Sequence, residues 1–180
     1  MAHNVHDVFK DQFNEFMDQI GIWVIYTRSD PRFRCKECFD INTRDSPADC
    51  SSCFGTGFKV NLERWLVYPS NSLNFPAPVE APLIRPGILS DTSTFVFSRA
   101  TERPVVGDRV FIVEWNEPRE LIVPRNASPV SIVQALRIHF VEPLIAGQVI
   151  YYTSHCKFVT EAIRQYERAL SEAPIRISRA

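Results

Sequence analysis

The sequence has little glycine, almost no net charge and no long hydrophobic run. Only six of its 180 residues are glycine, and the formal net charge is −1 with an isoelectric point near 6.4. A chain this close to neutral has no strong field that would attract nucleic acid or anionic lipid. No segment is apolar enough to cross a bilayer, and residues 1–6 do not resemble a signal peptide. We therefore predict a protein made in a reducing cytoplasm, with neither a membrane partner nor a sequence-specific nucleic-acid partner.

Familiar catalytic patterns are also missing. The sequence has no phosphate-binding glycine loop, no HExxH motif and no Ser-His-Asp arrangement. Asp108 follows Gly107, a pair typical of a turn. His139, His155 and Cys156 fall on predicted strands and do not complete a set of four metal ligands, so we assign them core or surface roles. We expect no enzymatic activity, and a zinc-stabilised enzyme with an unrecognised site in the second half stays an alternative.

Four of the five cysteines form two CxxC hooks. They are Cys35, Cys38, Cys50 and Cys53. Four thiolates in this spacing can surround one tetrahedral zinc ion at about 2.3 Å each. Gly55 and Gly57 follow the second hook and supply a tight turn with positive φ, whereas Phe39 and Asp40 follow the first. The sequence therefore predicts a structural Zn²⁺ site with these four cysteines as ligands.

Other uses of the cysteines fit less well. Disulfides are less typical of two local CxxC pairs in a chain without a secretory signal. A redox CxxC would open a helix of a thioredoxin-like unit, and no such context is present. An iron–sulfur cluster also takes four thiolates, but no companion electron-transfer features occur. Catalytic zinc needs an open coordination position, which four cysteines would close.

The chain divides into three predicted regions. Residues 1–68 hold an amphipathic helix at 4–20 and strands at 21–28 and 58–63. The two strands lie on either side of the hooks and form a zinc-knuckle hairpin with an exposed loop at 39–49. Residues 69–86 contain five prolines and are expected to be extended without continuous sheet pairing. Residues 87–180 form the third region, which is rich in predicted strands.

The third region indicates a small antiparallel barrel or sandwich. Strands are predicted at 94–98, 109–115, 131–141 and 148–153, separated by turn residues. A last helix is predicted at 158–173, and the tail Ile175 to Ala180 is expected to be mobile. The expected fold class is thus α+β, mostly β, and residues 87–180 are expected to form either a separate domain or one unit with residues 1–68.

Several of these motifs together resemble a known family. The stretch from Gly21 to Tyr26, the two hooks with Ser46-Pro47 before the second, the Gly55 to Phe58 turn and Pro104 to Val110 are similar to zinc-containing neck proteins of tailed bacteriophages. The resemblance covers roughly residues 1–115. It implies a virion structural protein made in the host cytoplasm, a head–tail connector or adaptor that forms a homo-oligomeric ring with portal and tail proteins as neighbours.

A second function remains open. A zinc-ribbon adaptor that binds nucleic acid or a protein partner would use the same Cys-x-x-Cys-x-Gly-x-Gly hook. A DnaJ-like protein repeats that hook, and this chain does not. Steeply salt-dependent binding would identify a nucleic-acid partner. In the connector interpretation, by contrast, the loop at 39–49 projects toward a partner and residues 69–86 pack on an adjacent subunit.

Overall fold

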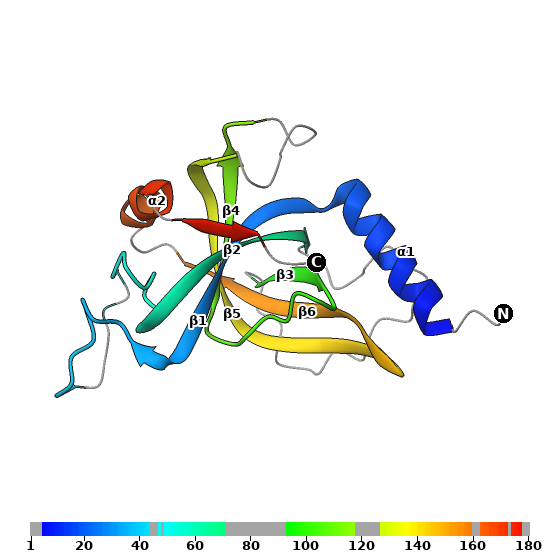
Figure 1. The fold of residues 1–180 in the computed structure, drawn as a ribbon, viewed down its shortest axis with the longest axis horizontal. Helices are drawn as coiled ribbons and strands as arrows, with labels where there is room; N and C mark the ends of the chain where they lie inside the picture. Colours follow the sequence, from blue (N-terminus) through cyan, green and yellow to red (C-terminus); the bar gives the residue numbers. More distant parts are fainter. Residues whose placement is uncertain are drawn as a thin grey trace.

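The residues that the structure describes form two helices and seven strands (Figure 1). The computed structural model describes residues 5–43, 47, 49–70, 93–117, 127–159, 163–172 and 174–177. The elements are α1 (Val5–Ile20), β1 (Ile22–Arg34), β2 (Phe58–Ser70), β3 (Ser93–Arg99), β4 (Arg109–Trp115), β5 (Pro129–Ala146), β6 (Gln148–Phe158), α2 (Ile163–Glu172) and β7 (Ile175–Ile177). The prediction of an α+β, mostly β fold is confirmed.

Six of the strands form one closed antiparallel sheet. Their order is β1-β4-β5-β6-β3-β2, and β2 pairs again with β1. The long β1–β2 ladder matches Ile22 with Val67 at one end and Arg34 with Phe58 at the other. β3 pairs with the last three residues of β2 and along the whole of its length with β6. Strands from both sides of the proline-rich region therefore belong to the same sheet.

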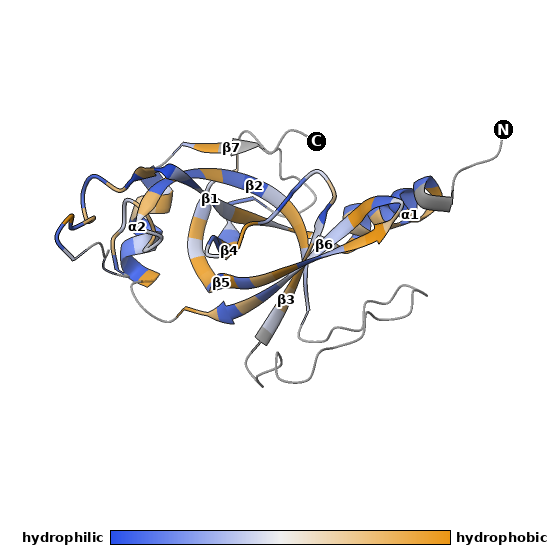
Figure 2. Ribbon diagram, turned by 90° about the horizontal axis from the view of Figure 1, so that it is seen from below, coloured by the Kyte–Doolittle hydropathy of each residue, from blue (hydrophilic) through white to orange (hydrophobic). Residues whose placement is uncertain are grey.

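Three hydrophobic clusters hold the closed sheet together. The first lies inside it and contains residues of all six strands, among them Tyr26 and Trp65, whose rings stack 3.7 Å apart. The second and third lie outside the sheet, under α2 and α1 respectively. Since β1 packs against both an inner and an outer cluster, residues 24–27 are all buried and no simple alternation marks them. Figure 2 shows hydrophobic and hydrophilic segments alternating along the curved strands of the closed sheet.

The two helices lie at opposite ends of the molecule (Figures 1 and 2). Phe13 and Met17 of α1 are buried in the third cluster, and the Phe13 ring stacks on Tyr151 of β6 at 4.6 Å. Tyr166 and Leu170 of α2 are buried in the second cluster. No helix among the described residues has the length and apolar character needed to span a membrane.

Two predictions were wrong, one about the C-terminal tail and one about the start of the proline-rich region. The tail was expected to be mobile, but Ile175–Ile177 forms β7, which pairs in parallel with residues 62–64 of β2. Residues 69–86 were expected to have no continuous sheet pairing, but β2 extends to Ser70 and Pro69 is paired with Val96. The ladder of β2 with β1 already ends at Val67, so on that side of β2 the missing N–H of Pro69 interrupts no ladder hydrogen bond. Residues 71–92, which include the other four prolines of the predicted arm, lie outside the described residues.

Candidate metal centre

The two CxxC hooks meet at the end of the β1–β2 hairpin. β1 ends at Arg34, directly before Cys35, and β2 begins at Phe58, shortly after Cys53. All four sulfur atoms lie within 4.8 Å of one another. The Sγ atoms of Cys35 and Cys50 are 3.9 Å apart, and those of Cys38 and Cys53 are 3.4 Å apart. A tetrahedron with metal–sulfur bonds of about 2.3 Å has sulfur atoms about 3.8 Å apart. The four cysteines are therefore placed to hold a metal ion.

Left-handed backbone at the second hook makes this convergence possible. The φ angles are 51° at Phe54, 66° at Gly55 and 75° at Gly57. The predicted role of the two glycines is thus confirmed, since glycine adopts such angles without steric cost. Thr56 closes the turn, because its backbone N–H and its hydroxyl both donate to the carbonyl of Cys53, at 3.0 and 2.7 Å.

The first hook reaches its geometry without glycine. The backbone N–H of Phe39 donates to the carbonyl of Cys35 at 3.3 Å. The guanidinium of Arg34 lies over the rings of Phe39 and Phe58, at 4.8 and 4.3 Å from their centroids. Cation–π contacts of this kind stabilise by about 0.5–1 kcal/mol at exposed sites. Arg34 therefore joins the loop after the first hook to the strand that follows the second.

Further hydrogen bonds tie the hooks to each other. The backbone N–H of Cys35 donates to the carbonyl of Gly57 at 3.0 Å, and the hydroxyl of Ser52 donates to the carboxylate of Glu37. The second hook is also closed on itself, since the N–H of Gly55 donates to the carbonyl of Cys50 at 3.2 Å. The two hooks therefore form one folded unit at the tip of the hairpin.

The thiols affect one another's protonation. Burial raises the pKa of the Cys35 thiol, but hydrogen bonds from the N–H groups of Glu37 and Cys38 and from neighbouring thiols outweigh burial and bring it below its usual value. Burial and the neighbouring sulfurs raise the pKa of Cys38, and burial is the largest cause of the raised pKa of Cys53. Several thiolates cannot share this volume without a compensating cation, which a divalent ion would supply.

Phe54 anchors the centre to the protein core, a role that the sequence analysis missed. Its side chain is only 3% exposed, and its ring lies 5.4 Å from the rings of both Phe111 of β4 and Tyr166 of α2. A bulky residue with positive φ is unusual, because its Cβ crowds the backbone. In the sequence, the one local indication of this role is a large aromatic residue between the last cysteine of the hook and a turn glycine. The partners of the ring become visible only when α2 packs against the sheet.

The remaining metal-binding residue types lie elsewhere. Cys156 is buried in the inner cluster, and His139 is exposed on β5. His155 is 8% exposed, and its Nε2 lies 3.2 Å from the carboxylate of Glu142. Within the described ranges, the four predicted cysteines are the one group of three or more potential ligands close enough to share an ion.

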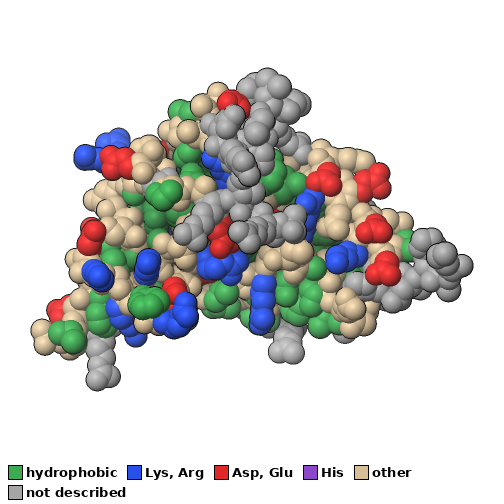
Figure 3. Space-filling view, viewed as in Figure 1, with side chains coloured by type: hydrophobic (Ala, Val, Ile, Leu, Met, Phe, Trp, Pro, Cys, Tyr) green, Lys and Arg blue, Asp and Glu red, His purple; other side chains and the backbone are tan. Residues whose placement is uncertain are grey.

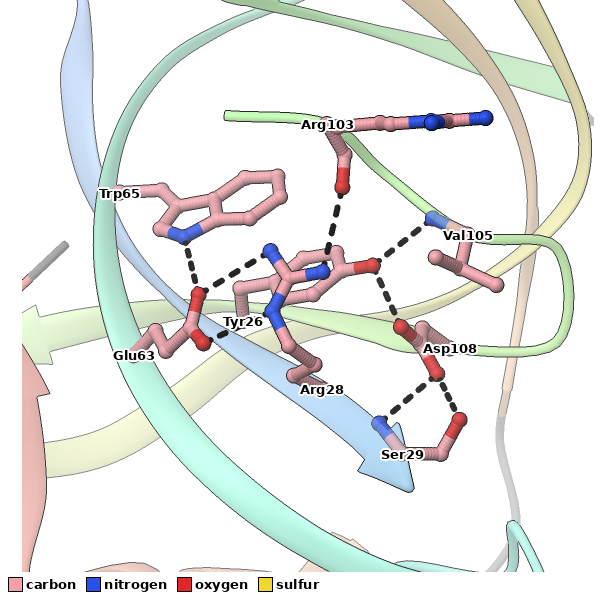
Figure 4. Close-up of polar contacts among 8 residues, drawn as sticks. All are labelled: Tyr26, Arg28, Ser29, Glu63, Trp65, Arg103, Val105 and Asp108. Carbon is pink, nitrogen blue, oxygen red and sulfur yellow. Dashed lines mark hydrogen bonds and ion pairs between the residues drawn. The ribbon is translucent and has the colours of Figure 1, made fainter. Parts of the chain in front are cut away.

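Asp108 has a larger role than the turn assigned to it. Its buried carboxylate accepts hydrogen bonds from the Tyr26 hydroxyl at 2.5 Å and from the backbone N–H of Ser29 at 3.1 Å, as well as from the Ser29 hydroxyl (Figure 4). Burial raises the pKa of Asp108, and burial with the charge of Asp108 strongly raises that of Tyr26. The sequence could not indicate this contact, because about eighty residues separate the partners.

A second part of the same network surrounds Glu63. Its carboxylate accepts hydrogen bonds from Arg28 at 2.8 and 3.3 Å and from the indole N–H of Trp65 at 2.9 Å, and Arg28 also donates to the carbonyl of Arg103 (Figure 4). Apart from the Trp65–Glu63 bond within β2, the side-chain contacts of this network join different elements. The arrangement joins β1, β2 and the loop before β4, and so it fixes the base of the hairpin that carries the cysteines.

Comparisons with known proteins identify no family for this chain. Neither the protein-family models nor the curated proteins give a match. The geometry of the described residues is therefore the basis for the assignments that follow.

Proposed function

We propose that Cys35, Cys38, Cys50 and Cys53 hold one structural Zn²⁺, and that the protein is a virion structural protein, a ring subunit of the head–tail connector, or neck, of a tailed bacteriophage. The observation that carries this proposal is the four-sulfur cluster at the tip of a hairpin whose base is fixed in the closed sheet. Four sulfur ligands complete a tetrahedral shell, so the ion would stabilise the fold and leave no position for substrate.

The donor set favours zinc. Soft thiolates select zinc, copper(I) or iron–sulfur clusters over hard cations such as magnesium and calcium. The sulfur separations of 3.4 and 3.9 Å suit a single ion. Backbone N–H groups directed at the Cys35 sulfur are the outer hydrogen bonds that orient thiolate ligands. Binding would release protons from the thiols and contribute its free energy to folding.

The shape of the molecule supports a ring subunit. The metal loop and α2 lie at one end, whereas α1 and the β5–β6 turn lie at the other (Figures 1 and 2). Both ends expose large apolar side chains, with Phe33 54% and Ile41 79% exposed near the hooks and Ile145 60% exposed near the β5–β6 turn. Unlike surfaces at opposite ends allow head-to-tail contacts, which form rings when the rotation closes. Exposed apolar side chains grouped at such ends are typical of interaction surfaces.

Electron microscopy of the native assembly, with metal analysis of the same purified material, tests the proposal. We expect a ring in the virion neck with one zinc ion per chain. A zinc-bearing monomer that is absent from virus particles would refute the connector role and leave the metal site intact. In that case a zinc-ribbon adaptor becomes the better interpretation, and binding that weakens steeply with salt would identify nucleic acid as its partner.

A further inference from the structure

We infer that adjacent copies of this chain dock through opposite charges, with the acidic outer face of α1 in one copy seated on a cationic groove beside the metal hooks of the next copy. This inference rests on the proposed ring and names the surfaces that would form it.

The cationic groove lies along the hairpin end next to the first hook. It has a volume of about 590 Å³ and is lined by Arg32, Phe33, Arg34, Cys35, Lys36, Glu37, Ser52, Lys59 and Val60. Four of these side chains are cations and one is a carboxylate, Glu37, which accepts a hydrogen bond from Ser52. Asp30 pairs with Arg32 at 2.7 Å, so the remaining positive charge comes from Arg34, Lys36 and Lys59.

The position of the cations keeps them accessible to a partner. Arg34, Lys36 and Lys59 are exposed, whereas Cys35 and Cys53 are 6% and 0% exposed and Cys38 and Cys50 are half-buried. All four cysteines are thus less exposed than the three cations, so an approaching surface would meet the positive groups before the negative charge of a loaded zinc–thiolate centre. The half-exposed Phe33 ring lines the same groove, with its centroid 6.0 Å from the Lys59 Nζ.

The acidic face of α1 has the complementary charge. Asp7, Asp11, Glu15 and Asp18 follow one another at steps of three and four residues, so they lie on one side of the helix. All four are exposed, and Lys10 is the one lysine or arginine in α1. The carboxylate of Asp18 pairs with Arg99 of β3, so Asp11 and Glu15 carry the charge that a partner would meet at the middle of this face. The opposite side, with Phe13 and Met17, is buried against the sheet. The acidic side is therefore directed away from the protein's own core.

The two surfaces cannot meet within one copy. They lie at opposite ends of the molecule, and Figure 3 shows Lys and Arg side chains gathered near the β1–β2 tip and Asp and Glu side chains over α1. The whole chain has a net charge of only −1, so this separation of charge is a property of the surfaces and not of the composition. Electrostatic complementarity fixes orientation and speeds association between such surfaces.

An apolar contact would complete the interface. Val8 is 42% exposed and lies three residues before Asp11, on the acidic side of the helix. Phe33 is 54% exposed and lines the cationic groove. An aromatic side chain within a polar rim is the usual composition of an interface centre. A second copy therefore offers the groove both carboxylates for its cations and an apolar side chain for Phe33.

Charge reversal on each surface in turn tests the inference. The first variant carries Lys36→Glu and Lys59→Glu, and the second carries Asp11→Lys and Glu15→Lys, all in the full zinc-loaded chain. The control carries Arg137→Glu and Lys157→Glu, two exposed residues on β5 and β6 outside both surfaces. Self-association is measured by sedimentation at low and high salt, and metal content is measured for every variant.

We expect each reversed variant to associate at least about tenfold more weakly than the wild type, because like charges would then face each other. An equimolar mixture of the two variants should recover association, since each reversed surface then meets its complement. The control should associate as the wild type does. Recovery in the mixture cannot arise from misfolding, so it separates an interface from a folding defect.

Three results would overturn the inference. They are a wild type that stays monomeric at all salt concentrations, variants that associate normally, and a mixture that does not recover. Salt-sensitive binding of single-stranded DNA that is lost in the Lys36 and Lys59 variant, without self-association, would instead assign the groove to nucleic acid. None of these results touches the proposed connector role, which fails only if the protein is absent from virus particles.

Discussion

Replacement of Phe54 tests whether the metal centre depends on the core of the closed sheet. The ring is 3% exposed and packs between Phe111 and Tyr166 at 5.4 Å from each. Truncation of a buried phenylalanine to alanine costs about 3–5 kcal/mol in stability, because contacts are lost and a cavity is left. We therefore expect Phe54→Ala to lower the free energy of unfolding by that amount, and to lower Tm by roughly 6–20 °C for a chain of this length.

The backbone at Phe54 adds a second, sharper expectation. Its φ of 51° strains any residue with a Cβ, by about 1–2 kcal/mol. Phe54→Gly should consequently be more stable than Phe54→Ala by about 1 kcal/mol, the reverse of the order found at most positions. Phe158→Ala is the matched control, because Phe158 is 45% exposed, lies outside both proposed docking surfaces, and its truncation should change stability by less than about 0.5 kcal/mol.

Urea unfolding followed by tryptophan fluorescence, on zinc-loaded protein at fixed metal concentration, measures these differences. Equal stabilities for Phe54→Ala and Phe158→Ala would refute the anchoring role of Phe54. A Phe54→Gly variant that is less stable than Phe54→Ala would refute the argument from backbone strain and leave the packing argument in place.

Three further predictions concern the metal and two buried carboxyl groups. Cys53→Ser should abolish zinc binding and lower the free energy of unfolding by about 4 kcal/mol when the zinc concentration is a thousandfold above Kd. Thermal unfolding of wild type and variant, with and without chelator, checks this. A stability difference between the two proteins that persists in chelator would contradict it. Burial raises the pKa of Glu102 from 4.5 to about 7, so the folded state holds a proton that the unfolded state loses, and stability should fall as pH rises from about 4.5 to 7. Glu102→Gln should remove that slope. Its stability relative to the wild type should rise by about 3 kcal/mol between pH 4.5 and pH 7. Curves of stability against pH that run parallel for the two proteins would disprove the assignment. Asp108→Ala should lower the free energy of unfolding in urea by about 2–4 kcal/mol, because it leaves the Tyr26 and Ser29 hydroxyls without their acceptor. A loss of stability no greater than that caused by Asp40→Ala, at an exposed aspartate, would refute this.

The sequence by itself determined the features that depend on neighbouring residues. The four cysteines were predicted as a set because each CxxC hook and its turn are local, and the structure brings them together. α1 and the strands at 109–115 and 148–153 were predicted from periodicity and β-branched content, which also act over a few residues, and the second of these strands extends to Phe158 in the structure. The φ values of Gly55 and Gly57 followed from the local need for a tight turn.

Only the tertiary structure decided the features that join distant segments. Closure of the sheet requires β2 to pair with both β1 and β3, and no local propensity specifies that partner choice. β7 forms because the three residues after α2 reach the edge of β2, a contact across more than one hundred positions. Asp108 and Phe54 likewise acquire their partners from elements far along the chain. Burial of such groups depends on the assembled core, which residue spacing alone cannot describe.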